Sequence, residues 1–294
     1  MSLKNFKFII NNNAASGHIA KNMESVIAKI KKYFPSAECH ITKNITDLDN
    51  CLANLDGIDA VIAVGGDGTL NGIVNKIGDE DIVFGILPYG TGNDFAYSAK
   101  VPVDMDEALE FIKQFKVKNI DLGKITTNKY TKYFVNTIGI GFDAMVAYKT
   151  NHMKFFKGKI KYFLSLFSAI CTYKSYNLNI ETESTKINKK CFLLSIGNGK
   201  RSGGAFILTP DAIIDDSVFQ FCMVDDISIF KFFTAVPKVL NGSHGKLKII
   251  NFQSAKQIKV KTDSEMYLHY DGETPCKIDN AFIEVLPAKI KFIC

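Results

Sequence analysis

The sequence predicts a mixed α/β fold in two domains, and three observations support this prediction. The chain has 294 residues, which is long for a single hydrophobic core. Up to about Asp121, short apolar runs alternate with helical patterns, as in βαβ units around a parallel sheet. After Asp121 the apolar runs follow one another closely, which is typical of antiparallel strands. We therefore expect a Rossmann-like three-layer domain at 1–121, an antiparallel β-sandwich-like domain at 122–286, and a tail at about 287–294 that returns to the first domain.

The elements of the first domain follow from apolar periodicity. Four short apolar runs predict its strands, at residues 6–11, 37–41, 60–64 and 83–87. Between the first two runs, the apolar residues recur at i, i+3, i+4, i+7 and i+11: Met23, Val26, Ile27, Ile30 and Phe34. This spacing predicts one amphipathic helix that begins near Gly17 and packs on the sheet.

The second domain is predicted to consist mainly of strands. Its strand-like runs are residues 120–126, 133–140, 178–182, 191–196, 218–224, 246–252, 257–261, 266–270 and the short run 282–285. Helical patterns interrupt it at about 160–172 and 228–240, and Ser228 is a suitable N-cap for the second.

The composition and the absence of targeting patterns indicate where in the cell the protein is expected. The hydrophobic content of 47% and charged content of 22% are those of a folded globular protein. The seven cysteines include no C-x-x-C pair, the start lacks a cleavable leader pattern, and no apolar run reaches the ~20 residues that span a bilayer. We therefore expect a cytoplasmic protein, and the net charge of +6 favours anionic partners without indicating nucleic acid.

The strongest functional pattern follows the third predicted strand. There, a buried apolar run continues directly into the segment GGDGTLN, residues 65–71. Free backbone N–H groups at the start of a helix bind phosphate oxygens, and glycine allows the ligand to approach closely. Asp67 adds a carboxylate, which Mg²⁺ commonly takes as a ligand beside phosphates.

Two well-known phosphate loops are excluded by the residues present. The dinucleotide pattern G-x-G-x-x-G fails because Asn71 or Ile73 occupies the last glycine position. The Walker pattern fails because every Gly-Lys pair is followed by Ile, Arg or Leu in place of Ser or Thr. An ordinary dehydrogenase or P-loop enzyme is therefore disfavoured.

Two further loops are expected beside the first. LPYGTGNDFA, residues 87–96, follows the next predicted strand, and NNNAASG, residues 11–17, follows the first strand. The carboxyl ends of parallel strands meet at one sheet edge, where open α/β sheets bind their ligands. The loops are therefore predicted to line one crevice.

The pairing of GGDGTLN with LPYGTGNDFA strongly resembles the diacylglycerol kinase catalytic domain family, in its bacterial lipid kinase branch, which is related to sphingosine and ceramide kinases. The resemblance continues nearly to the end of the chain, through Asp121-Leu-Gly, GIGFD at 139–143, Gly203-Gly204, residues 210–216 and Asp271-Gly-Glu273. It implies an ATP- and Mg²⁺-dependent kinase that phosphorylates a lipid hydroxyl.

The resemblance also implies roles for particular residues. ATP is expected to contact the segment 65–71 and its flanking loops, at Asn11, Thr42, Gly65, Gly66, Asp67, Gly68, Thr69, Leu70, Asn71 and Thr91. Asp67 is expected near the active-site Mg²⁺, and Asp121 is expected to reach that ion through water. Asn12 replaces a proline that is common in the family's first loop.

Glu273 is the expected general base, because it matches the glutamate of the family's DGE segment and a base must accept the proton of the lipid hydroxyl. Asp271 is the closest rival, and the spacing of the two acids does not decide between them. An ordinary solvated acid in a D-G turn would explain Glu273 without any function.

A second, structural Mg²⁺ site is implied at Asp216 and the backbone carbonyls of Ile213 and Val218. The family usually has glycine at the next position, where this chain has Ser217, so an ordinary turn is the alternative. The histidines show no metal-binding spacing.

Three functions are weighed. The first is transfer of the ATP γ-phosphate to diacylglycerol or a related lipid, presented at the inner face of a membrane. The others are a soluble NAD kinase-like enzyme and a non-catalytic nucleotide- or lipid-binding module. Lysines and aromatics alternate in residues 154–167, which fits a membrane-surface helix, although a helix buried on one face fits better. A homodimer is also an open hypothesis.

Overall fold

The computed structural model describes residues 4–153, 158–273 and 276–294. Residues 154–157, the start of the segment considered above for membrane contact, lie outside this part. The described residues form a 13-stranded sheet and a two-stranded one, with helices packed against them. The strands are β1 Phe6–Asn11, β2 Glu38–Thr42, β3 Ala60–Gly65, β4 Val83–Pro88, β5 Val117–Thr127, β6 Thr131–Phe134, β7 Thr137–Gly141, β8 Tyr176–Thr182, β9 Lys186–Gly197, β10 Arg201–Ser202, β11 Phe206–Ile207, β12 Phe219–Asp225, β13 Ile250–Ala255, β14 Gln257–Tyr270 and β15 Cys276–Ile293.

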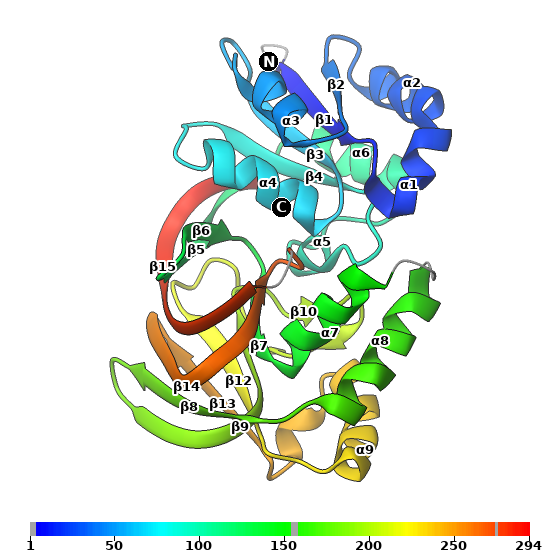
Figure 1. Cartoon of the computed structure of the whole chain (residues 1–294). Coiled ribbons are helices and arrows are strands. Elements are labelled where there is room, and N and C mark those ends of the chain that lie inside the picture. The colour runs from blue at the N-terminus through cyan, green and yellow to red at the C-terminus, as the bar shows by residue number, and fades with distance from the viewer. Residues whose placement is uncertain (1–3, 154–157, 274–275) are drawn as a thin grey trace.

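The helices occupy two regions (Figure 1). Most N-terminal helices flank the strands of the upper part, and the later helices α7, α8 and α9 lie beside the antiparallel strands of the lower part. They are α1 Ala14–Lys21, α2 Met23–Tyr33, α3 Ile45–Leu52, α4 Asp67–Ile77, α5 Asp94–Ser98, α6 Met105–Lys113, α7 Phe142–His152, α8 Gly158–Thr172, α9 Ile229–Leu240 and the 3₁₀ turn η1 His244–Lys246.

The sheet combines both kinds of strand pairing. β2, β1, β3 and β4 are neighbours in that order and pair in parallel, and the end of β15 adds a further parallel pair to β4. The other strand pairs among the described residues are antiparallel. The predicted mixed α/β fold with a β-rich C-terminal part is therefore confirmed.

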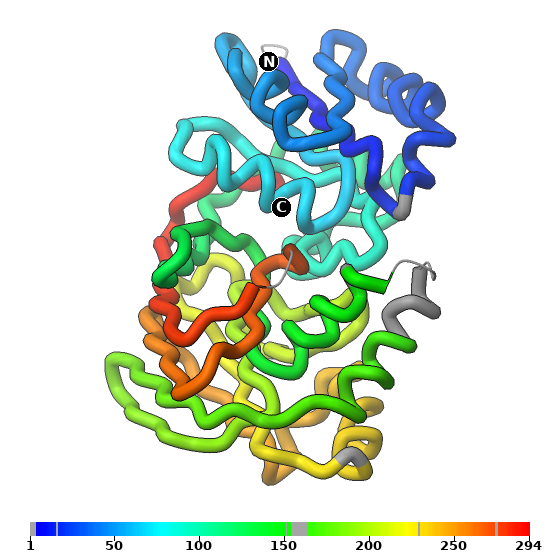
Figure 2. Tube along the Cα trace, viewed as in Figure 1, coloured from blue at the N-terminus to red at the C-terminus, as the bar shows by residue number. Residues whose placement is uncertain are grey.

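Two strands connect the upper and lower parts. β15 pairs with β5 along almost its whole length, and a register shift between Leu286 and Ile290 bends the pair. Figure 2 shows the C-terminal segment, in red, running back to the N-terminal part, where Phe292 pairs with Phe84 of β4. The end of the chain thus pairs with a strand of the N-terminal part, while the assignment of the tail to the first domain and the division at residue 121 stay predictions.

The buried side chains form two large clusters. One surrounds the parallel strands and includes Phe8, Ile62 and Phe84, and the other lies among antiparallel strands and includes Leu194 and Phe221. This agrees with the expectation that one core of this length would be too large.

Several predicted elements have different bounds. The helix expected from about Gly17 is divided at Asn22 into α1 and α2, and the runs 257–261 and 266–270 form one irregular strand, β14. The run 246–252 is mainly a 3₁₀ turn and a connection before β13 begins at Ile250. The run 282–285 is the middle of an 18-residue strand. Ser228 caps α9 as predicted, with its hydroxyl accepting from the Lys231 amide at 3.4 Å.

Candidate active site

The β3–α4 turn has the geometry of a phosphate-binding turn. β3 is fully buried, and α4 begins at Asp67 directly after the extended residue Gly66. The Gly66 carbonyl accepts from the amides of Thr69 and Leu70. A side chain at Gly65 would place its Cβ 2.3 Å from Thr69 Oγ1, so only glycine fits there. The turn therefore leaves the first amides and the positive end of α4 available for an anion.

The second glycine loop touches the first, as predicted. The Tyr89 amide donates to the Gly65 carbonyl at 2.8 Å. A Cβ on Gly90 would lie 2.4 Å from Gly66 Cα, so any side chain would separate the two loops. Asn93, at φ 52°, holds the loop by accepting from the Gly90 amide at 2.8 Å. The two loops therefore form one continuous wall.

Asp67 and Asp94 form a carboxylate pair behind this wall, in which Asp94 is buried and Asp67 is partly buried. Asp67 accepts from the amides of Asp94 at 3.0 Å and Phe95 at 2.8 Å, and burial raises its pKa. Burial, and then the charge of Asp67, raise the pKa of Asp94 to about 7. Sequence reasoning did not select Asp94, although its place at the end of the GTGND loop was a usable signal.

Arg201 is the single arginine of the sequence and lies beside this pair. Its Nε is 3.4 Å from Asp94 Oδ1, and its guanidinium lies 4.6 Å from the centre of the Tyr97 ring. Because Arg201 belongs to β10 and Tyr97 to α5, this contact joins the lower part of the molecule to the glycine loops. The planar guanidinium of arginine can stack flat on a ring while its N–H groups pair with a carboxylate, a geometry that the compact lysine ammonium does not share. The sequence analysis did not predict a role for Arg201, because the residues next to it, such as Gly199, form no motif that indicated one.

Asp271 fixes the DGE turn in place. Its buried carboxylate accepts from Asn71 Nδ2 at 2.9 Å and from the amides of Val135, Asn136 and Thr137 at 2.7 to 2.9 Å. Burial raises its pKa to about 6, although these donors act in the opposite direction. The same bonds explain why the predicted strand 133–140 is divided: the amides between β6 and β7 bind Asp271 instead of a neighbouring strand.

Glu273 lies two residues further on and faces the first glycine turn. A Cβ on Gly68 would lie 2.8 Å from Glu273 Oε1, so the carboxylate occupies the space beside that glycine. Burial, and then the charge of Asp271, raise the pKa of Glu273. Among the described residues no hydrogen-bond donor to this carboxylate is found, whereas the Asp271 carboxylate is fully engaged. Of the two acids, Glu273 is the one free to accept a proton.

A polar cavity of about 420 Å³ lies on one side of the DGE turn. Asn11 Nδ2 donates to Thr69 Oγ1 at 3.0 Å in its wall. The structure brings together six of the predicted site residues around it: Asn11, Thr42, Gly68, Thr69, Asn71 and Glu273. The side chain of Leu70 instead lies in the hydrophobic core, so only its backbone is available to a ligand.

A second cavity, of about 600 Å³, lies on the other side of the turn. Asp67, Asp271 and Gly272 line it, and so does Thr91, which had been expected beside the nucleotide residues. Asp143 and His269 form an ion pair in its wall, with 3.0 Å between Oδ2 and Nε2. Burial acts most strongly on His269 and lowers its pKa, but the charge and hydrogen bond of Asp143, together with the charges of Asp271 and Asp94, outweigh burial, so the pKa is raised.

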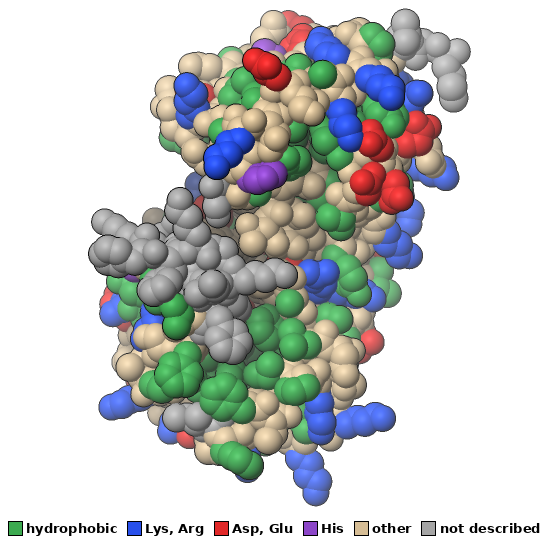
Figure 3. All heavy atoms as spheres, turned by 90° about the vertical axis from the view of Figure 1, so that its right-hand side faces the viewer, with side chains coloured by type: hydrophobic (Ala, Val, Ile, Leu, Met, Phe, Trp, Pro, Cys, Tyr) green, Lys and Arg blue, Asp and Glu red, His purple; other side chains and the backbone are tan. Residues whose placement is uncertain are grey.

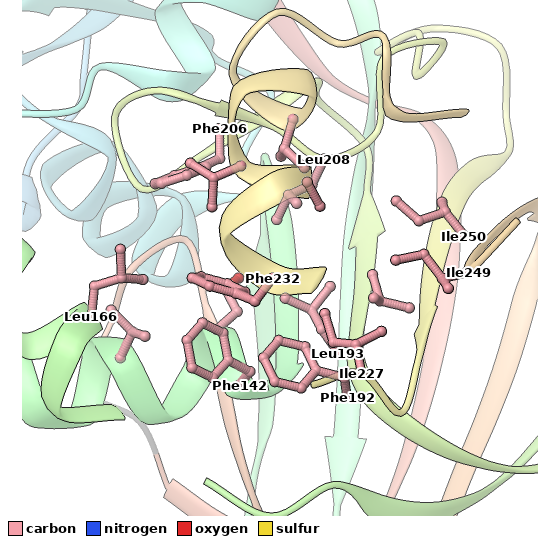
Figure 4. Close-up of a pocket in the computed structure, with 16 residues that line it drawn as sticks. Phe142, Leu166, Phe192, Leu193, Phe206, Leu208, Ile227, Phe232, Ile249 and Ile250 are labelled. Atoms are coloured by element: carbon pink, nitrogen blue, oxygen red, sulfur yellow. The ribbon is translucent and has the colours of Figure 1, made fainter. Parts of the chain in front are cut away.

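The second cavity continues into an apolar pocket of about 80 Å³ between α7, α8 and α9 (Figure 4). Asp143, Leu166, Phe206 and Val236 line both spaces. The rings of Phe142, Phe192 and Phe232 face one another in the pocket, with centroids 4.5 to 5.8 Å apart. The turn 271–273 therefore separates a polar cavity from a space that becomes increasingly apolar.

Asp121 is placed away from both cavity walls. Its buried carboxylate accepts from the amides of Ser217 at 2.6 Å and Ala288 at 2.8 Å. Asp216, in the same loop, accepts from the Val218 amide at 3.2 Å, and burial raises its pKa. The described residues contain no group of three or more His, Cys, Asp or Glu side chains that could hold a metal ion. Asp121 thus stabilises the loop that carries Asp216.

Ser217 adopts a left-handed conformation, with φ 64°. This conformation costs a residue with a Cβ roughly 1–2 kcal/mol, and glycine avoids most of that cost. We expect Ser217→Gly to stabilise the fold by about 1 kcal/mol, with the Asp121 hydrogen bond kept. Thermal unfolding should show the gain, and Ser217→Ala, as the control, should show none. An unchanged or lower melting temperature of Ser217→Gly would contradict the strain.

In the part of the chain that the structure describes, no helix has both the length and the apolar composition required to span a bilayer.

Nearly the whole chain is similar to known proteins. Residues 5–125 match the family described as the diacylglycerol kinase catalytic domain, and residues 136–294 match the YegS C-terminal NAD kinase beta sandwich-like domain. The chain is 26% identical over 287 residues to the protein named diacylglycerol kinase of Staphylococcus saprophyticus, which covers 96% of this chain and 93% of that protein. The Staphylococcus aureus (strain MRSA252) protein of the same name is also 26% identical, over 96% of this chain and 90% of its own length.

A solved structure has the same overall arrangement. The crystal structure of a proposed diacylglycerol kinase from Bacillus anthracis str. Sterne superimposes with a TM-score of 0.79 at 26% identity, covering 100% of this chain and 98% of that one.

Proposed function

Because this chain belongs to the bacterial branch of the diacylglycerol kinase catalytic domain family, it is a kinase of the lipid kinase class, and we propose that it transfers the γ-phosphate of ATP to the hydroxyl group of diacylglycerol or a closely related lipid. One observation supports this proposal above others. The turn Asp271-Gly272-Glu273 lies between a polar cavity beside the glycine loops and a cavity that continues into an apolar pocket. Such an arrangement suits a charged phosphate donor on one side and an acyl-bearing acceptor on the other.

We assign residues 1–121, with the tail from 287, as the Rossmann-like nucleotide-binding domain. The triphosphate of ATP lies against the amides of residues 65–71, where the helix dipole of α4 favours negative charge. Asn11, Thr42 and Thr69 line the rest of the nucleotide cavity, whose volume of about 420 Å³ is within the range of ligand sites. Thr91 lines the second cavity, which we assign to the lipid acceptor, on the other side of the glycine loops.

The residues around Asp67 fit a divalent cation. Asp94 is buried beside the partly buried Asp67, and the charge of Asp67 is the second cause, after burial, of the raised pKa of Asp94. A cation held by these carboxylates would relieve that repulsion. A bound Mg²⁺ would neutralise charge on the β- and γ-phosphates. A separate structural ion at Asp216 and the carbonyls of Ile213 and Val218 stays part of the proposal, and Asp121 supports that loop through its bond to Ser217.

Glu273 is assigned as the general base. Phosphoryl transfer requires mainly positioning and charge neutralisation, but the proton of the attacking hydroxyl must be accepted. The Glu273 carboxylate lies beside Gly68 at the phosphate-binding turn, and its raised pKa makes it a stronger base than an exposed glutamate. Asp271 positions the turn that carries it.

Gly68→Ala should reduce turnover while the protein stays folded. The added Cβ would lie 2.8 Å from Glu273 Oε1, so it should displace the base from the phosphate-binding turn. We expect kcat to fall at least about tenfold, because misplacing a catalytic group by about 1 Å can cost far more. Gly72→Ala, one turn later on α4, is the matched control, since its Cβ would make an ordinary contact 3.4 Å from Leu48. Equal effects of the two substitutions would contradict this placement of Glu273.

The function itself is tested with purified protein, Mg-ATP and a panel of acceptors: diacylglycerol, sphingosine, ceramide, phosphatidylglycerol, a prenol and NAD. We expect transfer of the γ-phosphate to diacylglycerol, or to another lipid of the panel with a free hydroxyl. Phosphorylation of NAD alone would overturn the proposal. ATP binding without transfer to any acceptor would instead support a binding module.

A further inference from the structure

Helix α9 carries an apolar stripe on its solvent-facing side. Phe230, Phe233, Pro237 and Leu240 follow the spacing i, i+3, i+7, i+10, which places them on one face of the helix. Phe230 is 78% exposed, Phe233 47% and Leu240 44%. Large apolar side chains in such a continuous row are unusual on a surface that only contacts water.

The opposite side of α9 is also apolar. Phe232, Ala235, Val236 and Val239 line the pocket of Figure 4 and account for the packing of the helix. A helix at the surface of a globular protein usually has one apolar face. The packing of α9 on the protein therefore does not explain its outer stripe.

The neighbouring helix α8 extends this surface. Its Leu166 lines the same pocket, whereas Leu164 and Phe167 are 37% and 58% exposed. Together with the stripe on α9 they form the α8–α9 patch, defined as Leu164, Phe167, Phe230, Phe233, Pro237 and Leu240. Figure 3 shows hydrophobic side chains gathered on the lower half of this face, with lysines around them. Among the described residues, every exposed phenylalanine lies in this patch.

The patch is continuous with the acceptor cavity. Leu240 is exposed on the outer stripe and also lines the second cavity, and Val236, one turn earlier, lines both that cavity and the apolar pocket. An acyl chain that leaves a bilayer at this face could therefore reach the acceptor cavity along apolar side chains. A soluble partner protein would require no such connection to the site.

The charge on α9 favours an anionic surface. Lys231 and Lys238 occupy the remaining face of the helix, α9 contains no acidic residue, and the described residues give neither lysine an ion pair with a carboxylate. A helix with aromatic residues on one face and lysines beside them is typical of segments that lie in the interface of a membrane.

We propose that the α8–α9 patch is the surface on which the protein docks to a bilayer containing anionic lipid, with the aromatic rings of α9 inserted among the acyl chains and Lys231 and Lys238 against the headgroups. The inference rests on the proposed function, because a lipid acceptor is what connects this surface to the cavity. It identifies α9 as a membrane-facing element, whereas the sequence pattern had suggested membrane contact only for residues 154–167.

The test is the binding of the full chain to sedimented vesicles, without nucleotide or acceptor. The probes are phosphatidylcholine vesicles with and without phosphatidylglycerol. We expect Phe230→Glu with Phe233→Glu to weaken binding at least about tenfold, since two aromatic side chains leave the interface. Val103→Glu is the matched control, because Val103 is 70% exposed but lies between α5 and α6, far along the chain from the patch. Lys231→Glu with Lys238→Glu should remove the preference for phosphatidylglycerol.

The outcomes separate this inference from the proposed function. If the Phe230/Phe233 variant sediments like the unmodified protein, the inference is overturned, whatever the acceptor panel shows. A variant that dissociates a dimer while vesicle binding is unchanged would assign the patch to a second copy and would also overturn it. Loss of binding together with normal turnover of a short-chain diacylglycerol in detergent micelles would support docking as a step distinct from chemistry.

Discussion

Replacement of Glu273 by glutamine is expected to lower kcat by about 10²- to 10⁴-fold, the usual contribution of a general base. The substitution keeps the size of the side chain beside Gly68 and removes only its ability to accept a proton. Binding of ATP depends on the glycine turn, Asn11 and Thr42, so the dissociation constant for ATP should change little. Steady-state kinetics and isothermal titration with a non-hydrolysable ATP analogue measure the two quantities separately.

The pH dependence gives a second measure of the same role. Burial and the charge of Asp271 raise the pKa of Glu273 above its ordinary value of 4.5. A base must be deprotonated to act, so kcat/KM should fall as the pH drops through this raised pKa. The fall should be absent from the residual activity of Glu273→Gln. Turnover by Glu273→Gln at the normal rate, or an unchanged acidic limb, would show that another group accepts the proton.

Replacement of Asp271 by alanine is expected to destabilise the fold by about 3–5 kcal/mol, the usual cost of breaking a buried hydrogen-bonded charge network. The substitution leaves Asn71 Nδ2 and the amides of Val135, Asn136 and Thr137 without their acceptor. Chemical denaturation measures the loss.

The control for this substitution is Asp263→Ala, an exposed acid on β14, the strand that leads into the turn of Asp271; this variant should stay within about 0.5 kcal/mol of the unmodified protein. Glu273→Gln should likewise unfold like the unmodified protein. If Asp271→Ala were as stable as Asp263→Ala, Asp271 would not be the residue that holds the DGE turn in place.

Some features of the fold could be predicted from the sequence and others could not. The positions of the parallel strands were predicted to within about one residue, because buried apolar runs end at glycine or polar residues that are visible locally. The division of the predicted strand 133–140 was not predictable locally. The division depends on the carboxylate of Asp271, which accepts from the amides of residues 135–137. Asp271 lies more than 130 positions later in the sequence, and only the fold brings it to these amides.

Other differences have similar causes. The α1–α2 break at Asn22 lies just before the apolar stripe that begins at Met23, so the stripe gave no sign that a separate helix precedes it. Helix α7 begins directly after a buried strand at Gly141, whose φ of 89° turns the chain. β5 and β15 each extend through both clusters of buried residues, so no change in composition marks where one ends.

In the candidate site, too, some residues could be recognised from their neighbours in the sequence, and others only from the fold. The glycine loops were recognisable because glycine is required wherever two backbones approach closely, as Gly66 and Gly90 do here. The place of Arg201 in the candidate site was not recognisable from the sequence, because its partners Asp94 and Tyr97 lie about a hundred positions earlier. The outer stripe of α9 was hidden for a different reason: its sequence is apolar on two sides, and only the structure shows which side is covered.

The most direct test of the account is a crystal structure with a non-hydrolysable ATP analogue and Mg²⁺. We expect the β- and γ-phosphates against the amides that follow Gly65, with the γ-phosphate near the Glu273 carboxylate and the metal ion at Asp67. A nucleotide bound elsewhere, or a γ-phosphate separated from Glu273 by the width of the cavity, would contradict the assignment of this crevice as the place where phosphate is transferred.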